Sequence, residues 1–260
     1  MASPDAHGIR VVCLGLVMLV VAPDCPAAPG EASRPQTNAA GAAIRWQDAA
    51  FETARQTWLA APTNFIAAWQ FGRACFDRAD LATNNAERAA VAELGIAACR
   101  DALAFDTNSA PVHYYLGMNL GQLAQTRALG ALKLVREMEA EFKAARLLDE
   151  RFDFAGPDRN LGLLYLQAPG WPTSLGSRAK ARHHLRRAVD LSPEYPENPL
   201  NWLEACLRWK DWQEAARALA RLESVWPEAR TKFTGAQWAA AWADWEARRA
   251  RASKAVADRP

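Results

Sequence analysis

PVHYYLGMNLGQL at residues 111–123 and EFKAARLLDERFD at residues 141–153 decide the fold of this 260-residue chain. The first segment carries small residues on an apolar face, and the second repeats apolar residues at intervals of three before an acidic turn. Such spacing is typical of amphipathic helices, because residues three and four apart lie on one helix face. Together the two segments predict a pair of antiparallel helices.

The same two segments recur along the chain. Counterparts of the first segment lie at residues 65–76, 156–166 and 198–209, and counterparts of the second lie at residues 97–108, 183–196 and 217–229. The small position of the first helices falls at Gly72, Gly117, Gly162 and Leu203. The early small position of the second helices falls at Gly95, Met138, Ala181 and Ala215, with intervals of 43, 43 and 34 residues. The chain is therefore a helical repeat with longer units at its start.

Two antiparallel helices pack closely only where one of them offers a small residue, and each pair buries its remaining apolar face against the next pair. A Leu-Gly position followed by spaced alanines and a proline is the tetratricopeptide pattern. We therefore expect an all-α, tetratricopeptide-like helical-repeat solenoid of about four helix pairs plus a C-terminal capping helix. The repeat domain is predicted at residues 43–248, followed by a polar tail at 249–260. Pro193 and Pro227 are expected to end second helices.

Composition agrees with a helical fold. Half of the residues are hydrophobic and 23% are charged, and alanine is abundant while isoleucine is rare. This bias favours helix over strand. The formal net charge of +2 is too balanced for a protein whose main partner is nucleic acid.

The N-terminal region has the pattern of an export signal. Residues 11–22 are uninterruptedly apolar after Arg10, a run too short to span a bilayer. We predict a signal peptide at residues 1–27, cleaved after Ala27, and a flexible linker at residues 28–42. An uncleaved anchor or a misplaced start codon is the alternative. Lipidation is not expected, because Asp24 precedes Cys25.

The run at residues 114–198 resembles the TRAP transporter TatT component family. The most specific segments are LGALKLV (129–135), AGPDRNLGLLYLQAPGWP (155–172) and YPEN (195–198), and the likeness extends over roughly residues 43–245. This resemblance implies an exported α-helical solenoid that assists a periplasmic solute-binding protein in uptake, with a ligand groove through the repeats. Members are typically lipoproteins, and in this feature the chain departs from the family.

In such a solenoid the first helix of each pair lines the concave face. The inward positions predict a ligand or partner groove made of Trp69, Arg73, Phe76, Tyr114, Met118, Gln122, Arg159, Leu163, Leu166 and Gln167. The same rule also places Asp77 of the first unit and Leu200, Glu204 and Arg208 of the fourth unit on the inward side. Apolar and aromatic walls with a few polar groups suit a small molecule or a peptide. Arg73 and Arg159 either clamp a carboxylate bidentately or form structural ion pairs. The apolar members either contact a ligand or pack between repeats.

Other conspicuous side chains receive structural interpretations. Trp171 is expected either to fill the space between helices or to form a contact at the groove mouth. Trp238, Trp242 and Trp245 share one helix face and are expected to seal the end of the solenoid. His183 and His184 are expected on a solvated helix surface. The acidic residues Asp149, Glu150, Asp153 and Asp158 are expected to cap a helix.

Neither a metal site nor a catalytic site is predicted, and no cofactor is expected. Cys75, Cys99 and Cys206 lack metal-ligand spacing, and GxSxG, HExxH and phosphate-loop motifs are missing from the sequence. Cys75 and Cys99 fall on facing helices, where they either pair or stay buried thiols. We expect a non-enzymatic periplasmic or secreted protein. Its expected partners are a solute-binding protein or other protein and a small organic acid or apolar ligand, and self-association stays open. The alternative is a general periplasmic protein–protein interaction scaffold with no small ligand.

Overall fold

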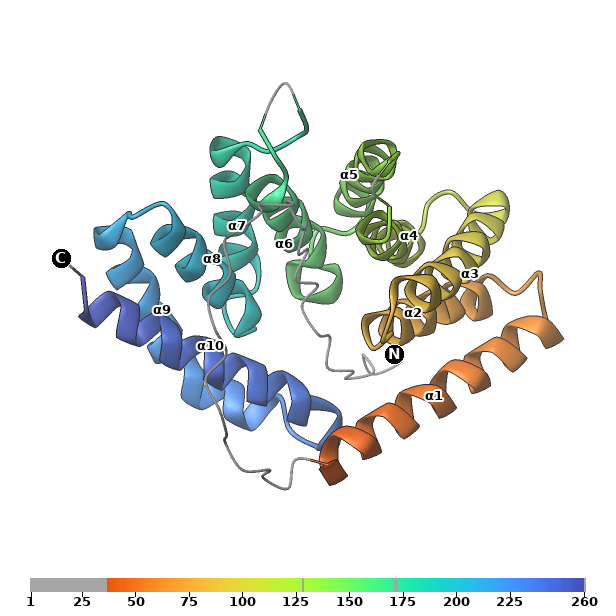
Figure 1. Cartoon of the computed structure of the whole chain (residues 1–260), viewed down its shortest axis with the longest axis horizontal. Helices are drawn as coiled ribbons and strands as arrows, with labels where there is room; N and C mark the ends of the chain where they lie inside the picture. The colour runs from red at the N-terminus through yellow and green to blue at the C-terminus, as the bar shows by residue number, and fades with distance from the viewer. Residues whose placement is uncertain (1–36, 128, 171–172, 260) are drawn as a thin grey trace, which may run out of the picture.

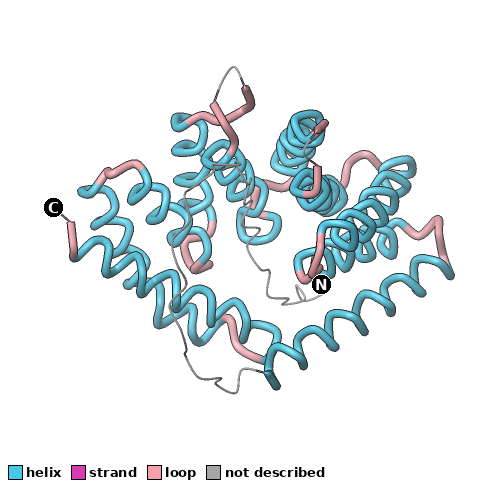
Figure 2. The backbone as a smooth tube through the Cα atoms, in the orientation of Figure 1, coloured by secondary structure: helices cyan, strands magenta, loops and turns pink. Residues whose placement is uncertain are grey.

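The helices of the chain follow one another in an arc (Figure 1). The computed structural model describes residues 37–127, 129–170 and 173–259. The helices within these ranges are α1 (Thr37–Ala60), α2 (Phe65–Asp80), α3 (Asn85–Phe105), α4 (Ala110–Gln125), α5 (Ala131–Leu148), α6 (Phe152–Gln167), α7 (Arg178–Leu191), α8 (Glu197–Arg208), α9 (Trp212–Lys232) and α10 (Ala239–Ala257), with a short 3₁₀ turn, η1 (Ala236–Trp238), before the last. Loops join them, and no strand is present in these ranges (Figure 2).

Helices α2 to α9 form the four predicted pairs, and the all-α helical-repeat fold is confirmed. Each pair packs internally, as α2 with α3, α4 with α5, α6 with α7 and α8 with α9. Helix α1 packs on α2 ahead of the first pair, and α10 packs on α8 and α9 after the last. Among the described helices, none is both long and apolar enough to cross a membrane. The predicted signal peptide at residues 1–27 lies outside the described residues.

The first helices form the inner layer of the arc. Helix α2 contacts α4, α4 contacts α6, α6 contacts α8 and α8 contacts α10, whereas the backbones of the second helices α3, α5, α7 and α9 stay farther apart and are bridged by side chains, such as Arg100 with Glu137 at 2.5 Å and Arg221 with Asp190 at 3.2 Å. Neighbouring pairs therefore approach more closely on the side of the first helices, which curves the chain toward that side. In this layer α10 takes the place that the first helix of a fifth pair would have.

The predicted small positions are the points of closest approach within the pairs. A Cβ atom added at Gly117 would lie 2.7 Å from Cε1 of Phe142 on α5, and one at Gly162 would lie 2.6 Å from Cγ of Leu185 on α7. At Gly72 it would lie 2.4 Å from Sγ of Cys99 on α3. These distances are shorter than van der Waals contact, so glycine lets the helices approach.

Replacing Gly162 with alanine is expected to destabilise the protein by about 1–3 kcal/mol, as overpacking does in a closed core. The added Cβ would also lie 3.0 Å from the Leu185 backbone nitrogen, which cannot turn away. Gly121→Ala is the control, because its Cβ would meet only the flexible Met138 side chain, at 3.0 Å. Urea unfolding measures both; equal free energies of unfolding would contradict the close-approach argument.

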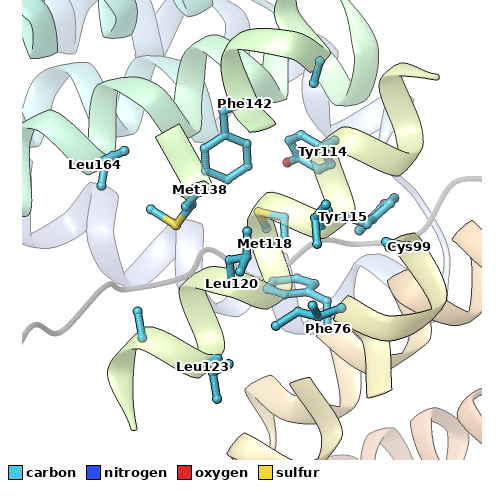
Figure 3. Packing of buried hydrophobic residues seen from close by; sticks show 14 of the residues in the cluster. Phe76, Cys99, Tyr114, Tyr115, Met118, Leu120, Leu123, Met138, Phe142 and Leu164 are labelled. Carbon is cyan, nitrogen blue, oxygen red and sulfur yellow. The ribbon is translucent and has the colours of Figure 1, made fainter. Parts of the chain in front are cut away.

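Two large apolar cores fill most of the arc and meet at α6, and a smaller cluster of Phe71, Cys75 and Ala98 lies between α2 and α3. The N-terminal core is rich in aromatic rings, and Figure 3 shows Tyr114 and Met118 of α4 beside Phe142 and Met138 of α5. The C-terminal core runs from Leu163 on α6 to Ala252 on α10. Leu166, also on α6, is packed against both cores. Helix α6 is thus the link through which the two halves of the molecule are held together.

Tryptophans close the C-terminal end, as the sequence predicts. Trp238, Trp242 and Trp245 are buried. The ring centroids of Trp242 and Trp245 are 5.0 Å apart, and those of Trp238 and Phe233 are 4.8 Å apart. The indole nitrogen of Trp242 donates a 2.7 Å hydrogen bond to the Phe233 carbonyl oxygen. Trp238 ends the 3₁₀ turn instead of lying within α10, yet its ring still joins the same cluster.

A buried arginine fastens the last helix. Arg248 on α10 pairs with Glu197 at 2.6 Å and Glu204 at 2.7 Å on α8, and it donates a 2.6 Å hydrogen bond to Asn201. Trp245 donates a 2.6 Å hydrogen bond to Glu197, whose carboxylate is almost completely buried. Burial of a charge is favourable only with such partners, so α10 can pack here only with Arg248 in place.

Arg248→Ala is therefore expected to lower the free energy of unfolding by about 3–5 kcal/mol, because it leaves the buried carboxylate of Glu197 without its ion-pair partner. Its neighbour gives a matched control: Arg249 pairs with Glu223 at 2.7 Å in a more exposed position, and Arg249→Ala should cost about 1 kcal/mol or less. Thermal or urea unfolding checks the difference, and two variants of equal stability would refute the fastening role.

Some predicted boundaries are wrong. Helix α10 continues to Ala257 with Ala252 buried, so most of residues 249–260 are helical, not a polar tail. Residues 37–42 of the expected linker are helical because α1 begins at Thr37. Pro193 does follow α7, but Pro227 lies inside α9. Burial of Trp226 and Ala229 on either side of Pro227 holds that helix together past the proline.

Candidate functional site

The inner face of α2 carries the partly exposed charged and aromatic side chains that the first repeat was predicted to offer. Trp69, Arg73 and Asp77 recur every four residues and so share one face. The Trp69 ring stacks on Tyr115 of α4, with centroids 6.0 Å apart and planes 9° apart. The Arg73 guanidinium lies 5.9 Å from the centroid of the same Tyr115 ring.

Asp77 has unusual electrostatics in this position. Burial raises the pKa of its carboxyl to about 7, against the opposing effect of Arg73, while Asp80 and Asp153 raise it further. Its carboxylate lies 3.9 Å from the Arg73 guanidinium, and the two side chains are 27% and 18% exposed. A carboxyl group that changes charge near neutral pH and still reaches solvent is a common feature of functional sites.

The raised pKa predicts a pH-dependent stability. Between about pH 4 and pH 7 the native state binds a proton at Asp77 that the unfolded state does not, so stability falls as pH rises through this window. Asp77→Asn removes the loss. The free energy of unfolding of this variant should exceed that of the wild type by about 1 kcal/mol or more at pH 8, and the two values should converge near pH 4. Urea unfolding across this range, with the exposed Asp101→Asn as control, tests it; a constant difference at all pH values would contradict the assignment.

A buried polar network lies beneath this face, where α4, α6 and α8 meet. Arg159 on α6 pairs with Asp153 at 2.6 Å, and Tyr114 on α4 donates a 2.7 Å hydrogen bond to the same carboxylate. Asn160 donates a 2.9 Å hydrogen bond to the Tyr114 hydroxyl oxygen. The Arg159 guanidinium also lies 5.1 Å from the Tyr195 ring centroid. Arg159 thus holds a structural junction.

The network stabilises a strained turn. Asp153, Phe154 and Ala155 have φ angles of 52°, 54° and 61°, a left-handed conformation that costs non-glycine residues roughly 1–2 kcal/mol each. Arg159 donates 3.1 Å hydrogen bonds to the carbonyl oxygens of Asp153 and Phe154, and Asn198 donates a 2.9 Å bond to the latter. This turn was not predicted from the sequence. Pro157 was the available signal, because proline is favoured in the first turn of a helix, so the regular part of α6 begins next to it.

Most predicted groove residues are buried in contacts between repeats. This holds for Phe76, Tyr114, Met118, Gln122, Arg159 and Leu163. For Met118 and Leu163, packing between repeats is the alternative that the structure supports, and for Arg159, at 3% exposure, it is the ion pair. An open carboxylate clamp at Arg159 is therefore wrong. Trp69, Arg73, Asp77, Leu166 and Gln167 keep partial exposure. Trp171 lies outside the described residues.

A second buried ion-pair network contradicts two expectations. Asp158 is completely buried; the Nδ1 atom of His184 lies 2.6 Å from one of its oxygens and Arg187 lies 3.2 Å from the other. His184 is therefore not on a solvated surface, although His183 is exposed. Asp153 pairs with the buried Arg159, and Asp158 contacts His184 and the partly exposed Arg187, so neither acts as the expected helix cap. Their roles depend on partners distant in sequence, which local spacing does not indicate.

The described cysteines have the burial and raised pKa values of structural thiols. Cys75, Cys99 and Cys206 are buried free thiols, so Cys75 and Cys99 are not paired. Burial raises the pKa of Cys206 to about 12 and raises those of Cys75 and Cys99 as well. Within the described ranges, no group of three histidine, cysteine, aspartate or glutamate side chains is arranged to hold a metal ion.

Two hollows lie away from this face. Small side chains of α1 and α2, including Ala50, Thr53 and Ala67, surround an open hollow of about 440 Å³. A smaller apolar pocket of about 160 Å³ lies between α5, α6 and the following loop, lined by Leu132, Leu164 and Gln167 among others.

Comparison with known proteins adds no assignment. No family model matches the chain, and no curated protein matches its sequence. Membership of the TatT component family therefore stays a prediction, and the argument for function depends on the inner face of α2 and α4.

Proposed function

We propose that the protein binds a ligand or partner segment on the inner face formed by Trp69, Arg73 and Asp77 of α2 with Tyr115 of α4, and that it performs no chemistry there. One observation carries the proposal. Trp69, Arg73 and the Asp77 carboxyl group, which has a pKa of about 7, converge on the concave side and stay partly exposed, and the buried Tyr115 ring beneath them contacts Trp69 and Arg73. Apolar surface with a few convergent polar groups is the usual composition of a binding site.

The chemistry of these side chains suits a small organic acid or a peptide segment with an apolar body. The partly exposed Trp69 ring, which stacks on the buried Tyr115 ring, offers a flat surface for an aliphatic or aromatic group. Arg73 offers N–H donors to a carboxylate. Asp77, 3.9 Å away, competes for Arg73 when ionised and less when protonated, so binding of an acidic ligand should weaken as pH rises through 7.

Binding without catalysis is favoured by the state of the reactive side chains. The described thiols are buried with raised pKa values. His113 contacts Glu141 at 2.6 Å and His184 contacts Asp158, so each is already engaged within the protein. The histidine and cysteine side chains named here therefore supply no free nucleophile beside Trp69 and Arg73.

We place this binding function outside the cytoplasm, as an accessory step of TRAP-type solute uptake. The support is the export-signal pattern of residues 1–27 and the resemblance of residues 114–198 to the TatT component family. In this setting the protein partner is a periplasmic solute-binding protein, and the ligand is the solute that it carries.

A general interaction scaffold is the second candidate. Its support is the burial of Phe76, Met118, Gln122 and Leu163, which leaves little open groove on the inner face for a small ligand. The hollow of about 440 Å³ between α1 and α2 offers small side chains instead, and these allow close approach of a partner helix.

Native mass spectrometry of the purified full chain, before and after denaturation, separates the two functions. We expect a co-purifying small molecule whose occupancy falls at least about tenfold in Arg73→Gln, a loss of about 1.4 kcal/mol. Trp69→Ala should act likewise. Arg136→Gln, an exposed arginine on α5, is the control and should keep full occupancy. A wild-type protein with the bare polypeptide mass would refute the small-ligand function and leave the scaffold.

A further inference from the structure

The outer layer opens between α7 and α9, and arginines gather there. The backbones of these two helices do not approach closely, although Arg221 of α9 pairs with Asp190 of α7 at 3.2 Å, and Trp202 of α8 also lines the space between them. The opening holds a pocket of about 140 Å³ lined by Arg186, Arg217 and Arg221 together with smaller and acidic side chains. Because α7 and α9 are second helices, this pocket belongs to the outer layer of the arc, and none of its lining residues belongs to the inner face of α2 described above.

A row of arginines runs from this pocket along α7. Arg178, Arg182 and Arg186 recur every four residues and alternate with two tryptophans of the next pair. Arg178 and Arg182 each lie 5.2 Å from the Trp209 ring centroid, and Arg182 and Arg186 lie 5.5 and 5.8 Å from that of Trp202. Stacking on flat rings holds each guanidinium in place, which lowers the entropy lost when a ligand binds it.

The charge of this surface is not balanced within the described residues. Arg182 pairs with Asp211 at 2.8 Å, Arg217 with Glu214 at 2.5 Å and Arg221 with Asp190 at 3.2 Å. Arg178 and Arg186 are exposed and lie over tryptophan rings, and neither forms one of these ion pairs, although the charge of Arg178 helps to lower the pKa of Asp211. Two positive charges therefore face solvent at the two ends of the row.

We propose that this arginine–tryptophan row is a docking surface for an extended acidic segment of a partner protein. The spacing supports the assignment: residues four apart on a helix are about 6 Å apart along its axis. Alternate side chains of an extended chain are about 6.6 Å apart. Glutamates or aspartates at every second position of a partner strand would therefore face Arg178, Arg182 and Arg186 in turn. This inference is independent of the inner-face function.

Fluorescence anisotropy of a labelled Glu-Ala-Glu-Ala-Glu peptide with the full chain at low salt tests the proposal. We expect saturable binding that weakens at high salt. Its affinity should fall about tenfold or more in the double variant R178Q/R186Q. The double variant R136Q/R251Q removes the same charge from exposed arginines elsewhere and should bind within about twofold of the wild type. Circular dichroism establishes that both variants are folded.

The spacing of the glutamates along the peptide gives a second test of the proposal. An Ala-Glu-Glu-Glu-Ala peptide carries the same charge but places its acids at consecutive positions, so it should bind several-fold more weakly. Equal affinity for the two peptides, or equal loss in the two double variants, would show general charge attraction and overturn the proposal. Concentration-dependent self-association that R178Q/R186Q abolishes, without peptide binding, would replace the partner with a second copy and would also overturn it.

Discussion

Close approach of paired helices is the constraint on which the remaining structure depends. Gly72, Gly117 and Gly162 each face a side chain so near that a single added carbon would clash. Because the pairs can approach this closely, each buries its outer apolar residues on the next pair, and the chain continues as a curved stack. The position of every other side chain, inside the arc or outside it, follows from this packing.

The curvature of the arc determines which side chains are buried between repeats and which stay accessible for binding. Each first helix from α2 to α8 contacts the next helix of the inner layer, up to α10. Most inward side chains are therefore buried in contacts between repeats. What stays accessible on the inner side lies at its beginning, around Trp69, Arg73 and Asp77. The backbones of the second helices stay farther apart, and Trp202 of α8 lines the pocket between α7 and α9. A strongly packed solenoid thus offers separate surfaces of different charge.

Buried ion pairs join the parts that apolar packing leaves unspecified. Arg159 with Asp153 holds the left-handed turn at the start of α6, where the two cores meet, and Arg248 with Glu197 fastens α10. A charge with no partner would be costly in either place, so each pair permits one arrangement of its helices. The cost of an unpaired buried charge also explains why Arg159 has a structural role. Arg73 and Asp77 are nearer to solvent and can still contact a ligand.

The sequence by itself determined the helices, their pairing and the capping role of the tryptophans, because periodicity and small-residue spacing are properties of neighbouring positions. It also identified Trp69, Arg73 and Asp77 as inward side chains. It did not reveal that Arg159, Asp158 and His184 are buried, that residues 153–155 are left-handed, or that α9 continues past Pro227. Only the tertiary structure decided these features. The burial and the cost of a charge or a strained turn depend on partners from other repeats, such as Asn198 for Phe154 and Glu197 for Arg248, and no local pattern specifies which of them will meet.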